Sequence, residues 1–170
     1  MRKNSFWTAY ILVFIAQLLL SNYFTFTPWI MATVLPAMVL CIPLNVGTVG
    51  AMLVAFVTGL GADFLGEGII GLSALAAVPV AFLRNWIISI IFGPDLITRK
   101  KSFTFRRNGF QAVAIANAIA LALYLIIFVW AESAGTRSFG FIAGKVAASF
   151  AVSMVFGLLA VRAMAPSDAR

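Results

Sequence analysis

Long apolar runs separated by short polar turns constrain the fold of this chain more than any other feature. The runs begin near residues 6, 29, 47, 69, 109 and 141 and occupy most of the 170 residues. About 20 apolar residues in a helix span the hydrocarbon core of a bilayer. Charged residues make up 10% of the chain, whereas an ordinary soluble domain has about 25%. The chain therefore suits lipid as its solvent, and it is too apolar to be disordered.

These runs predict an all-α polytopic membrane protein with about six transmembrane helices in a single integral membrane domain, residues 1–170. The expected helices cover 6–26, 29–44, 47–63, 69–92, 109–130 and 141–163. Pro36 is expected to kink the second helix, because proline bends a membrane helix but is tolerated there. The fourth run has two interpretations: one tilted helix, or a crossing that ends near Arg84 with residues 86–92 in the interface.

The distribution of cations predicts the orientation, because Lys and Arg concentrate in the cytoplasmic loops of membrane proteins. Arg2 and Lys3 precede the first run, and residues 93–108 form a polar loop rich in cations. An even number of expected crossings separates the two regions, so both termini are expected in the cytoplasm. The loop is expected to lie against anionic inner-leaflet lipid, although selection for orientation alone or an acidic cytoplasmic partner would also explain it. The cations of this basic loop are Arg99, Lys100, Lys101, Arg106 and Arg107.

The polar residues also exclude several classes of function. Histidine is absent, which removes His-based proton transfer and His metal ligation. Cys41 is the only cysteine and lies in an apolar run, so it is interpreted as a small buried hydrophobic residue. The net charge of +7 is explained by cations that flank apolar runs, so nucleic-acid binding is not expected. Phosphate-loop, nucleophile–base and paired-carboxylate patterns are missing, so no enzyme activity, cofactor or metal site is expected.

Small residues recur at four-residue spacing, which is typical of faces where membrane helices approach closely. Packing within the chain is the plainer interpretation, and docking of a foreign transmembrane helix is the alternative. On the third run this stripe leads to Asp63. The stripes are Ala51, Ala55 and Gly59; Ser73, Ala77 and Ala81; Ala114, Ala118 and Ala122; and Gly140, Gly144 and Ala148.

Asp63 and Arg84 are the charged residues most worth explaining. Asp63 ends the third run, where it is either a solvated residue or helix cap, or a buried anchor that fixes the turn or meets a partner. Arg84 lies within the fourth run, and a charge at membrane depth is a functional candidate by default. Snorkelling to the inner headgroups is the alternative for Arg84. Gly66 and Gly68 are expected to permit a positive φ in the turn between these runs.

The segment Gly59–Gly66, with the sequence GLGADFLG, is followed by Gly71 and Leu72. This pattern resembles the signature of the rod shape-determining MreD family: a glycine one turn before an aspartate, a short glycine turn, and Gly-Leu opening the next helix. Residues 81–84 resemble the end of the fourth helix in some members. In the turn, residues 67–70 replace the usual small residue and proline. The specific resemblance covers about residues 50–95.

The resemblance implies a non-enzymatic scaffold or regulatory subunit of the bacterial cell-elongation complex, in the cytoplasmic (inner) membrane. Such a subunit acts in cell shape and lateral peptidoglycan synthesis. It binds an MreC-like membrane protein and, through it, influences MreB filaments and the RodA–transpeptidase pair. The structural or partner-contacting candidates on this interpretation are Gly59, Asp63, Gly66, Gly71 and Arg84.

The MreD family is also similar in its six-helix architecture to the substrate-binding subunits of energy-coupling-factor transporters. The alternative function is therefore a vitamin-capture subunit. A subunit of that class needs a polar, aromatic-lined pocket beneath its outer loops. The expected outer loops of this chain are short and carry few hydrogen-bonding side chains.

Overall fold

The computed structural model describes residues 3–24, 30–66, 69–93, 109–133 and 137–164. Within these ranges the regular elements are helices, and none is a strand. The helices are α1 (Lys3–Phe24), α2 (Leu35–Cys41), the 3₁₀ helix η1 (Leu44–Val46), α3 (Gly47–Leu65), α4 (Leu72–Phe92), α7 (Phe110–Ser133) and α8 (Phe139–Met164).

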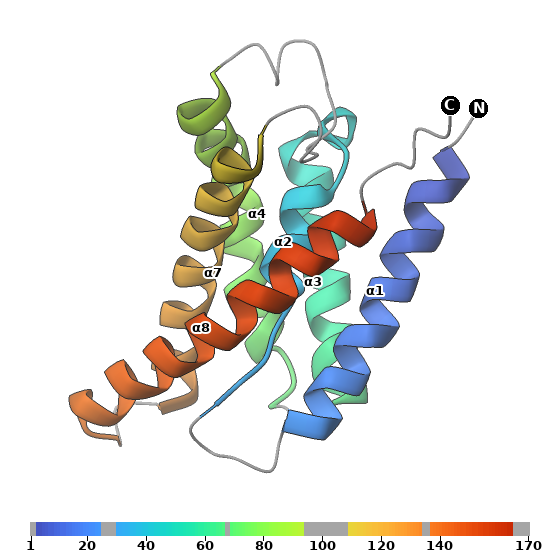
Figure 1. Cartoon of the computed structure of the whole chain (residues 1–170). Helices are drawn as coiled ribbons and strands as arrows, with labels where there is room; N and C mark the ends of the chain where they lie inside the picture. The colour runs from blue at the N-terminus through green and yellow to red at the C-terminus, as the bar shows by residue number, and fades with distance from the viewer. Residues whose placement is uncertain (1–2, 25–29, 67–68, 94–108, 134–136, 165–170) are drawn as a thin grey trace.

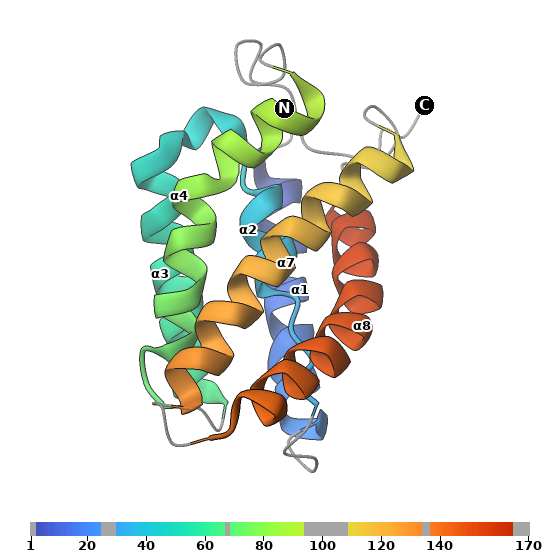
Figure 2. The same ribbon diagram turned by 90° about the vertical axis from the view of Figure 1, so that its left-hand side faces the viewer.

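The long helices form a ring around the short helix α2 (Figures 1 and 2). Among the described elements, α1 packs against α3, α3 against α4, α4 against α7, α7 against α8, and α8 against α1. The ring therefore closes in the order of the chain. Helix α2 contacts all of these long helices, so it occupies the centre of the molecule. Figure 1 places the start of α1 and the end of α8 at the same end of the ring.

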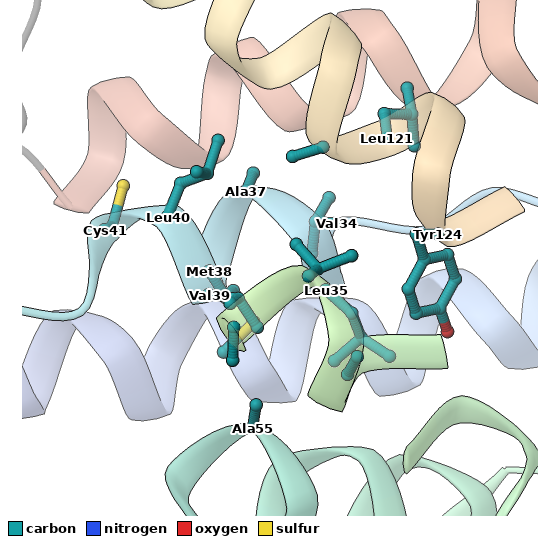
Figure 3. Packing of buried hydrophobic residues seen from close by; sticks show 14 of the residues in the cluster. Val34, Leu35, Ala37, Met38, Val39, Leu40, Cys41, Ala55, Leu121 and Tyr124 are labelled. Carbon is teal, nitrogen blue, oxygen red and sulfur yellow. The ribbon is translucent and has the colours of Figure 1, made fainter. Parts of the chain in front are cut away.

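Helix α2 forms the centre of the hydrophobic core (Figure 3). Each of its residues is buried, and Met38, Val39 and Leu40 have no exposed surface. Figure 3 shows Leu35 beside the ring of Tyr124 from α7, and Ala55 of α3 beneath Val39. Large apolar side chains also cover the outside of the ring, which suits contact with lipid tails. Examples on three helices are Leu12, Val57, Phe82 and Ile90.

The lengths and hydropathies of the helices indicate a polytopic helical membrane protein. In the described part of the chain, four helical segments are long and apolar enough to cross a membrane: Leu44–Leu65, α4, α7 and α8. The apolar part of α1, Phe6–Asn22, is shorter. The number of clear spans therefore differs from the expected number of about six.

The second apolar run is not the continuous helix expected over residues 29–44. Residues 30–34 form no regular element, and the α-helix is confined to Leu35–Cys41. Pro36 lies in the first turn of α2, where its missing N–H would have had no partner within the helix. Pro36 therefore starts a helix, and the prediction that it kinks one is wrong.

The fourth run is one helix. Helix α4 continues through residues 86–92 to Phe92, with Pro79 inside it. Helix α4 is therefore continuous past Arg84, and the position of residues 86–92 relative to the membrane stays a prediction.

The small-residue stripes face the interior on two helices and not on the others. Ala51, Ala55 and Gly59 are buried on α3, and Ser73, Ala77 and Ala81 are buried on α4. On α7 the predicted alanines are only half buried, and on α8 Gly140 and Gly144 are exposed. Small residues are common on both sides of these two helices, so size alone did not identify the packed face. The buried stripe of α8 is Lys145, Ser149, Ser153 and Gly157.

Candidate functional site

Asp63, near the end of α3, caps the N-terminus of α4. Its carboxylate accepts hydrogen bonds from the backbone N–H of Gly71 at 2.9 Å and from that of Ser73 at 2.9 and 3.1 Å. Both N–H groups belong to the start of α4, where they have no partner within the helix. Gly71 is the N-cap residue and has no side chain to serve them, so Asp63 supplies the missing cap. A negative charge at the N-terminus of a helix also interacts favourably with the helix dipole.

The close approach of α3 to α4 depends on Gly59. A Cβ atom at Gly59 would lie 2.5 Å from Cα and 2.6 Å from N of Ala74. The backbones of the two helices are therefore in direct contact one turn before Asp63. This contact lets Asp63, which is 4% exposed, reach the first N–H groups of α4.

The glycines of the turn have different roles from those expected. Gly71 has a φ of +95°, in the left-handed region, where glycine is favoured. Gly66 has a φ of −96°, so the prediction of a positive φ at Gly66 is wrong. The requirement at Gly66 is steric, because a Cβ there would lie 2.7 Å from the carbonyl oxygen of Ala62. Gly68 lies outside the described residues.

Arg84 points into the molecule. It has no exposed surface, and its Nη1 donates a hydrogen bond to the carbonyl oxygen of Ile42 at 2.8 Å. Ile42 follows the last residue of α2, and carbonyl groups at a helix C-terminus attract cations. Arg84 therefore joins the middle of α4 to the end of α2 and does not snorkel to the headgroups. The carboxylate of Asp63 binds the N–H groups of Gly71 and Ser73. It does not pair with Arg84, as expected from the separation of the two residues along the chain.

The segment at residues 30–34 has its backbone satisfied by side chains of α8. The N–H of Met31 donates to Ser149 Oγ at 2.9 Å, and the N–H of Thr33 donates to Ser153 Oγ at 3.0 Å. Ser153 Oγ also donates to the carbonyl oxygen of Met31 at 3.1 Å. Non-helical backbone at membrane depth is tolerated only where it is enclosed by protein or lines an aqueous cavity. The ring of helices provides that enclosure.

Gln17 of α1 completes this arrangement from the other side. Its Oε1 accepts a hydrogen bond from the N–H of Val34 at 2.6 Å, and its Nε2 donates to Ser21 Oγ at 3.0 Å. Two helices distant in sequence therefore hold one irregular segment. Sequence reasoning missed these residues, although two signals were present. Gln17 is an isolated amide in an apolar run, and Ser149 and Ser153 share one helix face.

Helices α7 and α8 are joined by an ion pair and by a close polar contact. Lys145 Nζ lies 2.6 Å from Glu132 Oε2, and the side chain of Lys145 is largely buried. A Cβ at Gly157 would lie 2.8 Å from Nδ2 of Asn117, so glycine makes room for this amide. These contacts fix the α7–α8 pair but bring no reactive groups together.

The basic loop lies outside the described residues, so the structure does not place Arg99, Lys100, Lys101, Arg106 or Arg107. Among the residues it does describe, no three His, Cys, Asp or Glu side chains gather in a way that could hold a metal ion.

Fold and site together define a helical membrane protein built as a ring around a buried central segment, with a capped hairpin between α3 and α4. Comparison of the chain with protein families, with curated proteins and with solved structures finds no match.

Proposed function

We propose that this chain is a non-enzymatic scaffold subunit of the bacterial cell-elongation complex in the inner membrane. On this proposal both termini are cytoplasmic, and the chain binds an MreC-like membrane protein that connects it to MreB filaments and the RodA–transpeptidase pair. The observation that carries the proposal concerns the residues of the MreD-like motif. Gly59, Asp63 and Gly71 act as one unit that closes the α3–α4 hairpin.

A scaffold needs a surface to present to its partner, and the hairpin carries an exposed apolar one. Large apolar side chains flank its turn, with exposed fractions between 54% and 74%. Asp63 and Gly59 hold the backbone beneath them, so little conformational freedom remains to be lost on binding. This surface, the hairpin tip, consists of Phe64, Leu65, Ile69 and Ile70.

Two features favour the scaffold over the vitamin-capture alternative. The centre of the ring is occupied by the apolar side chains of α2 (Figure 3). Gln17, Ser149 and Ser153, which could line a polar pocket, instead bind the backbone of residues 31–34. Polar groups used in this way are not free to recognise a polar ligand.

Affinity purification from gently solubilised membranes tests the proposal. The tagged wild-type chain should recover a single-pass MreC-like protein. Phe64→Ala with Ile70→Ala should reduce that recovery about tenfold or more, because each removes a large apolar contact. Phe82→Ala with Ile90→Ala is the matched control, since these residues are similarly exposed on α4. Recovery of ATPase and coupling subunits in place of the MreC-like protein would contradict the proposal and favour the transporter.

A further inference from the structure

A groove lies between the start of α7 and the last turns of α8, away from the hairpin. Its volume is about 410 Å³, within the range of about 300–1,000 Å³ typical of small-molecule sites. Its lining is apolar except for one guanidinium. Arg162 is exposed, and in the described part of the chain it has no ion-pair partner. The lining residues are Phe110, Val155, Leu158, Leu159 and Arg162.

We infer that this groove binds an anionic phospholipid, with one acyl chain between α7 and α8 and the phosphate at Arg162. Hydrocarbon is the ligand that suits walls of Val, Leu and Phe. A guanidinium binds phosphate oxygens through two parallel N–H donors. The ligand must therefore carry both an acyl chain and an anionic group, which a phospholipid does.

The start of α7 strengthens the attraction for an anion. Phe110 is the first residue of α7 and also lines the groove. The N-terminus of a helix carries a partial positive charge from its aligned peptide dipoles. Arg162 and this helix end thus place two sources of positive potential at one end of an apolar groove. A zwitterionic headgroup would gain less from them than an anionic one.

The position of the groove agrees with the proposed orientation. Arg162 lies in the last turn of α8, and Figure 1 shows that this end of the ring also holds the start of α1. If both termini are cytoplasmic, as proposed, the groove faces the inner leaflet, where anionic lipids attract basic residues. The inference rests on this orientation and is independent of the MreC-like partner.

Native mass spectrometry of the full-length chain, titrated with phosphatidylglycerol or with phosphatidylcholine of the same acyl chains, tests the inference. Wild type should bind phosphatidylglycerol more tightly. Arg162→Gln should weaken that binding about fivefold and leave phosphatidylcholine binding unchanged. Arg137→Gln removes the same charge beside Phe141, near the opposite end of α8, and should leave both affinities at the wild-type values.

A second set of variants tests the groove by filling it. Val155→Trp and Leu159→Trp each place a large ring in the groove, and either should weaken the binding of both lipids. Leu53→Trp, at an exposed position on α3, is the matched control and should have no effect. Two filling variants are used so that one remains if the other does not fold, as judged by size-exclusion elution.

Three results would overturn the inference. Equal weakening by Arg162→Gln and Arg137→Gln would show that net charge, and not the groove, selects the lipid. Unchanged binding in both filling variants would show that no acyl chain lies between α7 and α8. Conversion of a dimer to a monomer by the filling variants would show that a second copy of the chain occupies the groove.

Discussion

Asp63 is a carboxylate in apolar surroundings, a placement that is costly unless hydrogen bonds replace the lost water. Two backbone N–H groups of α4 supply those bonds. The same groups would otherwise be left without partners at the start of a helix whose N-cap is a glycine. The carboxylate and the two N–H groups therefore satisfy each other's hydrogen bonds.

Removing the Asp63 carboxylate should destabilise the hairpin. We expect Asp63→Ala to lower the free energy of unfolding by about 1–3 kcal/mol, because both N–H groups lose their acceptor. Asp63→Asn keeps one acceptor oxygen and should cost less. Chemical denaturation of the purified protein in detergent measures both. Phe64→Ala, at the exposed neighbouring position, is the control, and a loss as large as that of Asp63→Ala would contradict the capping role.

Adding one methyl group at Gly59 should separate α3 from α4. The new Cβ would overlap the backbone of Ala74, which cannot rotate away as a side chain could, so we expect Gly59→Ala to cost about 1–3 kcal/mol. Gly140→Ala is the matched control, because a Cβ there meets nothing within 4 Å. It should be neutral or slightly stabilising, since alanine favours a helix more than glycine does. Equal stability of the two variants would argue against the close contact.

Part of this site could be predicted from the sequence. Asp63 at the end of an apolar run, followed by glycines, indicates a cap or an anchor, and the structure shows both properties in one residue. The glycine with positive φ could not be identified, because several glycines lie close together and only the chain path decides which must be left-handed. The sequence also could not predict that the Arg84 side chain points inward, because its acceptor, the carbonyl oxygen of Ile42, is distant in sequence.

At the scale of elements, the central segment distinguishes this molecule from a simple helical bundle. Apolar runs predict the long helices well, because every backbone group in lipid needs an internal partner. The second run is as apolar as the others, yet the backbone N–H groups of Met31, Thr33 and Val34 bond to side chains of α1 and α8. Hydrophobicity alone does not separate a membrane helix from a buried irregular segment of similar length. Residues 30–34 could therefore not be predicted locally.

The hydroxyl groups of α8 should be required for the order of the central segment. Ser149→Ala with Ser153→Ala removes the acceptors of the Met31 and Thr33 N–H groups. We expect these amides to exchange hydrogen faster by about tenfold or more, because each unsatisfied group costs about 1–3 kcal/mol. Thr58→Ala is the control, since the Thr58 hydroxyl donates to the carbonyl oxygens of Val54 and Ala55 in its own helix. Unchanged exchange at residues 31 and 33 would contradict the structure of this segment.

Arg84 should hold the end of α2 in place, and Cys41 reports on it directly. Cys41 is buried at the last position of α2 and is the only cysteine of the chain. Loss of the bond to Ile42 in Arg84→Ala should free this end, so we expect a maleimide to label Cys41 about tenfold faster. Phe82→Ala, exposed on the same helix, should label at the wild-type rate. Equal rates in the two variants would show that Arg84 does not anchor α2.

At the scale of the whole molecule, the described long helices form a ring whose centre is filled by the apolar side chains of α2. The exterior is apolar on most helices, as lipid requires. Two surfaces are proposed as binding sites: the hairpin tip and the α7–α8 groove. The hairpin tip would bind a protein partner, and the groove would bind an anionic lipid.

The shape of cells that lack this protein tests the central claim most directly. In a rod-shaped host we predict that deletion produces rounded cells, since lateral wall synthesis loses its scaffold. The wild-type gene and the Phe82→Ala, Ile90→Ala variant should restore rods. The Phe64→Ala, Ile70→Ala variant should insert normally but leave the cells round. Rod-shaped cells in the deletion strain, measured by the ratio of length to width, would contradict the proposed function.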